Sequence, residues 1–172
     1  MSLFQNKYRI ESTRLKGWDY SSNGFYFVTI VTKNREKLFG HIENKQMILN
    51  DYGKIVEQCW FDLPNHYVNC KLDAFVIMPD HVHGIIEIDN SVFDIETGQR
   101  PVSTKKRHGL SQFVGSLNSY SAKKINILRN TIGATVWQSR FYDSIIRDEN
   151  SLDSIRNYIT DNPKNGLDEH FG

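Results

Sequence analysis

The sequence predicts a single α+β domain in which one antiparallel sheet carries helices on one face. Segments dense in β-branched and aromatic residues alternate with segments whose apolar residues recur at helical spacing. Their order is strand, helix, strand, strand, helix, strand, helix, and the first six form a split β-α-β arrangement. The chain has 172 residues, enough to bury one core, so residues 1–172 are expected to form one domain.

The first three predicted elements follow a polar stretch, residues 1–24, which we expect to be an irregular extension. Phe25 to Lys33 is dense in aromatic and β-branched residues, which is typical of a strand buried on both faces. Lys45 to Leu63 has an apolar stripe at helical spacing, and Pro64 is expected to end that helix. Leu72 to Met78 predicts the second strand.

The next elements begin with a strand from His81 to Ile88, joined to the preceding strand by the short Pro79-Asp80 connection, as in a hairpin. Residues 89–108 contain glycine, proline and a change from acidic to basic residues, and predict a mobile loop. Apolar residues at helical spacing predict a helix from Leu110 to Leu128, and Arg140 to Arg147 predicts a short strand.

The last element is a helix from Ser151 to Asn162, whose apolar residues recur at helical spacing. Ser151 or Asn150 is expected to cap its first turn, because both side chains can accept a backbone hydrogen bond there. Pro163 is expected to close the helix.

Composition limits the partners that the chain can attract. The net charge is +1, so no global field draws it to nucleic acid, and any polyanion must be held by local clusters of basic residues. The N-terminus has no apolar signal core, and the longest apolar stretch is too short to span a bilayer. We therefore expect a soluble cytoplasmic protein with no membrane partner.

His81 and His83 are the first candidate functional residues. Positions i and i+2 of a strand project from the same face, so both imidazoles point the same way. Two neighbouring imidazoles on a rigid backbone form half of a divalent-metal site. With helices on one sheet face, they are expected to line the open face or a groove under the last helix. The alternative is a pair of solvated or structural histidines.

Tyr158 and Asn162 supply the second half of the candidate site. They are four residues apart, so they share one face of the last helix. Asn162 offers a carbonyl oxygen as a third ligand for a hard divalent cation, and Tyr158 places a phenol one turn away. The alternatives are a core aromatic and, before Pro163, a simple helix terminator. Tyr120 and Tyr142 are rival nucleophiles, but neither has an asparagine one turn later.

Most of the chain resembles the single-tyrosine HUH transposases and, within them, the REP-associated tyrosine transposases. Four stretches carry the resemblance in the family's order: Phe25 to Ile30 with Asn34-Arg35, Val76 to Gly84, Trp137 to Asp143 with Ile145 to Arg147, and Tyr158 to Pro163 with Gly166. One departure is Ser144, which stands where the family often has a basic or histidine residue.

The resemblance implies a ferredoxin-like sheet and an enzyme that cuts and rejoins single-stranded DNA beside a hairpin. His81 and His83 match the family's metal ligands, Asn162 the third ligand, and Tyr158 the nucleophile that forms a 5′-phosphotyrosine. Mg²⁺ or Mn²⁺ would polarise the scissile phosphate, and ligand type does not separate the two ions. Such proteins can act as homodimers that exchange the tyrosine helix, and residues 132–135 are a candidate hinge.

Basic and aromatic side chains are candidates for contacts to the phosphates and bases of DNA, although basic residues are more often part of a solvated face. The candidates are Lys105, Lys106, Arg107, Lys123, Lys124, Arg140, Phe141 and Tyr142. Two other functions stay open: a metal-dependent phosphodiesterase that uses water as its nucleophile, and a catalytically silent domain that binds hairpin DNA.

Overall fold

The centre of the protein is a four-stranded antiparallel sheet, seen in a computed structural model that describes residues 3–4, 8–9, 15–94 and 107–165. The strand order is β6-β7-β3-β8. Their bounds are Cys70–Ile77 for β6, His81–Ile88 for β7, Gly24–Val31 for β3 and Tyr142–Ile146 for β8. The second, third, first and fourth main strands thus lie side by side, which is the ferredoxin-like order.

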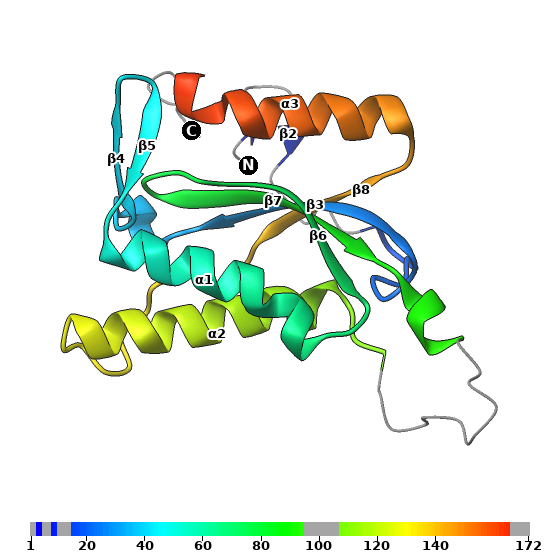
Figure 1. Ribbon diagram of the computed structural model, residues 1–172, viewed down its shortest axis with the longest axis horizontal. Helices are drawn as coiled ribbons and strands as arrows, with labels where there is room; N and C mark the ends of the chain where they lie inside the picture. The colour runs from blue at the N-terminus through cyan, green and yellow to red at the C-terminus, as the bar shows by residue number, and fades with distance from the viewer. Residues whose placement is uncertain (1–2, 5–7, 10–14, 95–106, 166–172) are drawn as a thin grey trace.

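Helices cover both faces of this sheet (Figure 1). α1 (Asp51–His66) and α2 (Leu110–Leu128) pack side by side on one face, and α3 (Glu149–Asn165) crosses the other. The predicted antiparallel α+β class is confirmed, but helices were expected on one face only, and α3 covers the second face because its apolar stripe packs there (Figure 1). β7 is an interior strand, as expected, and its second face lies under the last helix.

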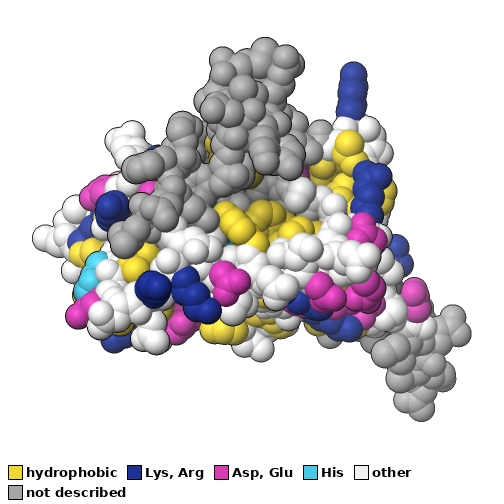
Figure 2. Space-filling view, turned by 90° about the horizontal axis from the view of Figure 1, so that it is seen from above, with side chains coloured by type: hydrophobic (Ala, Val, Ile, Leu, Met, Phe, Trp, Pro, Cys, Tyr) yellow, Lys and Arg dark blue, Asp and Glu magenta, His cyan; other side chains and the backbone are white. Residues whose placement is uncertain are grey.

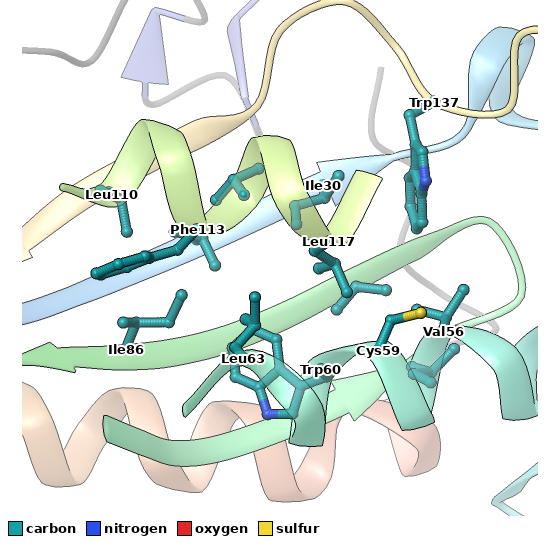
Figure 3. Packing of buried hydrophobic residues seen from close by; sticks show 14 of the residues in the cluster. Ile30, Val56, Cys59, Trp60, Leu63, Ile86, Leu110, Phe113, Leu117 and Trp137 are labelled. Carbon is teal, nitrogen blue, oxygen red and sulfur yellow. The ribbon is translucent and has the colours of Figure 1, made fainter. Parts of the chain in front are cut away.

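The larger core lies between the sheet and the α1–α2 pair (Figure 3). Trp60 of α1 is fully buried, and its indole stacks on Phe75 of β6 with ring centroids 4.4 Å apart. Gly84 of β7 lies beneath this indole, because a Cβ atom there would come within 2.3 Å of the Trp60 ring. The residue next to His83 therefore has to be glycine for Trp60 to pack in this position.

A smaller core lies between the sheet and α3, and it includes Ile85, Ile146, Leu152 and Ile159. The first turn of α3 is capped by Asp148, whose carboxylate accepts hydrogen bonds from the backbone N–H and the hydroxyl of Ser151. The expectation that Ser151 or Asn150 supplies the cap is therefore wrong. A carboxylate at this position also interacts favourably with the helix dipole.

A β-hairpin precedes α1, formed by β4 (Gly40–Glu43) and β5 (Gln46–Leu49), where the sequence predicted the start of a helix at Lys45. The turn residues Asn44 and Lys45 both have positive φ, 51° and 61°, as in the two-residue turn of a tight hairpin. The helix begins only at Asp51, where the Asn50 side chain accepts a hydrogen bond from the Gly53 N–H.

Two prolines lie inside helices that they were expected to end. α1 continues past Pro64 to His66, and α3 continues past Pro163 to Asn165. A proline close to the C-terminal end removes one helical hydrogen bond, and only a short last turn depends on it. α2 has the predicted bounds, and the strands differ from the expected ranges by one or two residues at most of their ends.

The remaining elements are short. β1 (Leu3–Phe4) pairs with β2 (Tyr8–Arg9) within the segment 1–24 that was expected to be irregular. Two 3-10 turns, η1 (Lys33–Arg35) and η2 (Asn90–Phe93), follow β3 and β7. Most of the predicted loop 89–108 lies outside the described residues. In the part of the chain that is described, no helix combines the length and apolar character needed to cross a membrane.

Candidate active site

The histidine pair is buried on the α3 face of the sheet. His81 lies opposite Val31 and His83 opposite Thr29 in the β7–β3 ladder. His81 is 4% exposed and His83 is 1% exposed, and their ring centroids are 4.6 Å apart. Of the two expected positions, the open face of the sheet and a groove under the last helix, the structure places the imidazoles under α3.

His83 is held from two sides. Its Nδ1 lies 2.9 Å from the Thr29 hydroxyl oxygen, and its ring stacks on Phe27 with centroids 5.5 Å apart. Burial, and next the charge of His81, lower the pKa of His83 well below the ordinary value. His83 is therefore neutral at pH 7, the form in which an imidazole binds a metal.

His81 is oriented by the residue before it. Its Nδ1 lies 2.6 Å from a carboxylate oxygen of Asp80. Burial raises the pKa of Asp80, but the hydrogen bond to His81 and the charges of His81 and Arg35 outweigh it, so the pKa is below its ordinary value. Each histidine thus has an oxygen partner at Nδ1, so Nε2 is the atom through which it would bind a metal. Such oxygen partners typically orient metal-binding histidines.

α3 brings the tyrosine to the histidine pair. The Tyr158 ring is half-buried, and its centroid lies 5.3 Å from that of His83 and 6.3 Å from that of Phe27. Asn162 follows one helical turn later and is 1% exposed. These contacts form within one chain, so the structure brings together His81, His83 and Tyr158, with Asn162 buried on the same helix.

A bidentate ion pair fixes α3 to the sheet. Arg156 donates through Nε and Nη2 to the two carboxylate oxygens of Asp73, at 2.8 and 2.7 Å. Asp73 belongs to β6, at an irregularity in its pairing with β7. Because a planar fork fixes direction as well as distance, this pair helps to fix the rotation of α3, the helix that carries Tyr158.

The side chains of His81, His83 and Asn162 fit a divalent cation that binds few protein ligands. Among the described residues, no three His, Cys, Asp or Glu side chains cluster as a metal site. Two imidazoles would then need an amide such as Asn162 as the third ligand. That set leaves coordination positions for water or phosphate oxygens, as Mg²⁺ and Mn²⁺ require when they act on phosphates.

The candidate DNA-contacting residues are scattered. Lys123 and Lys124 are exposed on α2, on the opposite side of the sheet from the histidines. Arg107 lies near Phe93 and Asp94, which follow the far end of β7. Lys105 and Lys106 lie outside the described residues.

The stretch before and into β8 is divided between the two faces. Arg140 is exposed, and Phe141 packs against the α1–α2 core. Tyr142 pairs with Thr29, so it lies on the histidine face. Of the rival nucleophiles, Tyr142 is therefore near the histidine pair, while Tyr120 is exposed on α2 and stacks on His66.

Three residues of the site were not predicted from sequence: Thr29, Phe27 and Asp80. Thr29 and Phe27 become neighbours of His83 only through strand pairing, so a sequence without the β3–β7 register cannot identify them. Asp80 precedes His81 directly, and an acid beside a candidate ligand is a signal that could have found it.

Two known proteins are similar to this chain in sequence. No model of a known protein family matches the chain. An uncharacterized protein of Haemophilus influenzae is 42% identical over 167 residues, covering 88% of this chain and 87% of the relative. A second protein of that organism, provisionally named a REP-associated tyrosine transposase, is 27% identical over 149 residues, covering 84% of this chain and 73% of the relative.

Solved structures with the same fold are also transposases by their descriptions. A REP-associated tyrosine transposase bound to a REP hairpin has a TM-score of 0.58 and 15% identity, covering 88% of this chain and 73% of that one. A structure from Deinococcus radiodurans, provisionally described as a transposase, has a TM-score of 0.50 and 17% identity, with 86% and 95% covered.

The chain therefore has the fold of two solved transposase structures and is similar in sequence to a protein named as a REP-associated tyrosine transposase. The chain belongs to one family with the 42% identical Haemophilus influenzae protein, and its resemblance to the REP-associated tyrosine transposases is confirmed.

Proposed function

We propose that this protein cuts and rejoins single-stranded DNA beside a hairpin, with Tyr158 as the nucleophile. The observation that carries the proposal is the contact between the Tyr158 and His83 rings, 5.3 Å apart and supplied by α3 and β7. A relative of the same fold was solved bound to a REP hairpin, which supports hairpin DNA as the substrate class.

His81, His83 and Asn162 would hold Mg²⁺ or Mn²⁺. When bound, such an ion polarises a phosphate and stabilises charge on its oxygens. The two histidines would bind through Nε2, because the partners of Nδ1 are the Asp80 carboxylate and the Thr29 hydroxyl. Neutral His83 loses no proton on binding the ion, so binding there needs no change of protonation near pH 7.

In the proposed reaction the Tyr158 oxygen attacks the scissile phosphorus, losing its proton. The bond from phosphorus to the 3′ oxygen breaks, and that oxygen leaves as a 3′-hydroxyl after taking up a proton. The product is a 5′-phosphotyrosine, so the reaction exchanges one phosphodiester bond for another. Attack by a 3′-hydroxyl on the phosphotyrosine reverses the step and rejoins the strand without a nucleotide cofactor.

Phe27 and His83 prepare the tyrosine for this attack. Both rings contact the phenol edge-on, with interplanar angles of 83° and 61°, so the ring has few orientations open to it. Fixed orientation of a nucleophile lowers the entropic part of the barrier.

The test is incubation with a single-stranded hairpin oligonucleotide and Mn²⁺, followed by denaturing gel electrophoresis. The wild-type protein should form a covalent protein–DNA adduct, and Tyr158→Phe should not. Tyr142→Phe and Tyr120→Phe are the matched controls, and both should keep the adduct. Cleavage without an adduct, retained in Tyr158→Phe, would instead indicate a hydrolase that uses water. Hairpin binding without cleavage would indicate a silent binding domain.

A further inference from the structure

We propose that the turn from Thr32 to Lys37 is a phosphate-binding turn that seats the backbone of a single DNA strand beside His81. The proposal rests on the proposed function and adds a substrate-binding site to it. None of the basic residues predicted from sequence belongs to this turn.

The position of the turn follows from the sheet register. β3 ends at Val31, which lies opposite His81, so the chain leaves the sheet at the histidine end. The Thr32 N–H donates to the Asp80 carbonyl oxygen at 2.9 Å. The buried Thr32 hydroxyl lies 3.1 Å from the same oxygen and 2.8 Å from the Glu36 carbonyl oxygen. The turn is thus fastened to the residue whose carboxylate orients His81.

The backbone of the turn has an uncommon conformation. Asn34 and Arg35 both have positive φ, 56° and 54°. Left-handed conformations are unfavourable for residues other than glycine and persist where surrounding contacts hold them. Those contacts include the Thr32 bonds and the bond from the Lys33 N–H to the Val136 carbonyl oxygen at 2.9 Å. The turn is therefore preformed, so ordering it on a ligand costs little.

The charge of the turn suits a phosphodiester chain. Lys33, Arg35 and Lys37 are its cations and Glu36 is its one acid, so its formal charge is 3 − 1 = +2, while the whole chain carries +1. Lys33 and Lys37 are exposed, and Arg35 is half-buried with its charge acting on Asp80. A guanidinium can bind phosphate through two parallel hydrogen bonds, and lysines add point charges.

The described part of the face above the histidines carries both acidic and basic side chains (Figure 2). Figure 2 looks down on the α3 side, where acidic and basic side chains both lie around exposed hydrophobic atoms outside the parts drawn in grey. Arg156 and Lys164 of α3 are already paired with Asp73, Asp153 and Asp161. A strand that reaches the histidine pair would therefore find the cations of the Thr32–Lys37 turn at the end of the sheet.

The test measures binding without chemistry. A fluorescent hairpin oligonucleotide with a single-stranded extension is titrated in EDTA with Tyr158→Phe protein, over about 50 to 300 mM NaCl. In that background, Lys33→Gln/Lys37→Gln is compared with Lys123→Gln/Lys124→Gln, which removes the same charge at the rival basic pair that the sequence suggested, on the opposite side of the sheet. Arg35→Lys, which keeps the charge without the fork, is a third variant.

Two lost phosphate contacts should lower the slope of log K against log salt by about 1.4 and the affinity at 0.1 M salt by roughly 10- to 30-fold. The α2 variant should keep the wild-type slope, and Arg35→Lys should weaken binding with its slope unchanged. An unchanged slope in the turn variant, or an equal loss in the α2 variant, would overturn the proposal. If wild-type protein binds the hairpin strongly but forms no adduct, the proposed chemistry is refuted and the proposed phosphate-binding turn is not.

Discussion

Replacing Gly84 with alanine tests how the core under α1 fixes the strand that carries the histidines. A Cβ at this position would lie 2.3 Å from Cη2 of Trp60 and 2.8 Å from Cζ2. That is about 1 Å short of the roughly 3.5 Å at which carbon atoms pack. Trp60 cannot retreat freely, because it is fully buried and stacked on Phe75.

Overpacking of this kind costs about 1–3 kcal/mol, and we expect the upper end because two stacked rings must move. Alanine regains about 0.5–1 kcal/mol relative to glycine within a strand, which leaves a net loss of about 2 kcal/mol. For a domain of this size, Tm should then fall by about 4–8 °C.

The assay is urea and thermal unfolding of Gly84→Ala beside Gly115→Ala. Gly115 is exposed on α2 with no atom near its absent Cβ, so alanine there should stabilise the helix by about 1 kcal/mol. In a Trp60→Phe background the cost of Gly84→Ala should shrink, because the smaller ring relieves the overlap. An equal cost in both backgrounds, or no loss at all, would refute this reasoning.

Two further predictions concern the groups that orient the site. Asp73→Asn removes the charge that pairs with Arg156, so the protein should lose stability and form adduct more slowly while still binding hairpin DNA. Asp153→Asn, which removes the exposed partner of the same arginine, should change little. The hydrogen bond from Arg156 is the main cause that lowers the pKa of Asp73. The stability advantage of wild type over Asp73→Asn should therefore be full above the unfolded pKa of about 3.9 and vanish as pH falls through the lowered folded pKa. Urea unfolding from about pH 7 to 2 measures this dependence. Thr29→Val removes the oxygen partner of His83 Nδ1 at nearly constant volume, so the Mn²⁺ concentration needed for adduct formation should rise about 10- to 100-fold. The control is Thr160→Val, because the Thr160 hydroxyl donates to a carbonyl oxygen within α3. An unchanged Mn²⁺ requirement in Thr29→Val would contradict the orienting role.

The main elements of the fold were predictable because each repeats one local pattern. Leu110 to Leu128 keeps its apolar stripe for the whole helix, and the prediction there matches the structure. The β4–β5 hairpin was missed because Ile48 and Leu49 also fit a helical stripe, and Asn44-Lys45 lacks the glycine that usually marks such a turn.

The candidate site was predictable only where its functional residues lie close together in the sequence. The His81–His83 spacing and the Tyr158–Asn162 spacing are local, and the structure places the histidines and Tyr158 together. Thr29 and the Arg156–Asp73 pair depend on strand register and on how α3 crosses the sheet, which are long-range properties. The sequence therefore identified the reacting groups better than the groups that orient them.

Peptide mapping of the protein–DNA adduct tests the central claim most directly. Wild-type protein would be incubated with hairpin DNA and Mn²⁺, digested with nuclease and protease, and analysed by mass spectrometry. The account predicts a nucleotide 5′-phosphate attached to the peptide that contains Tyr158. Attachment to Tyr142 or to any other residue, or cleaved DNA with no attached peptide, would contradict it.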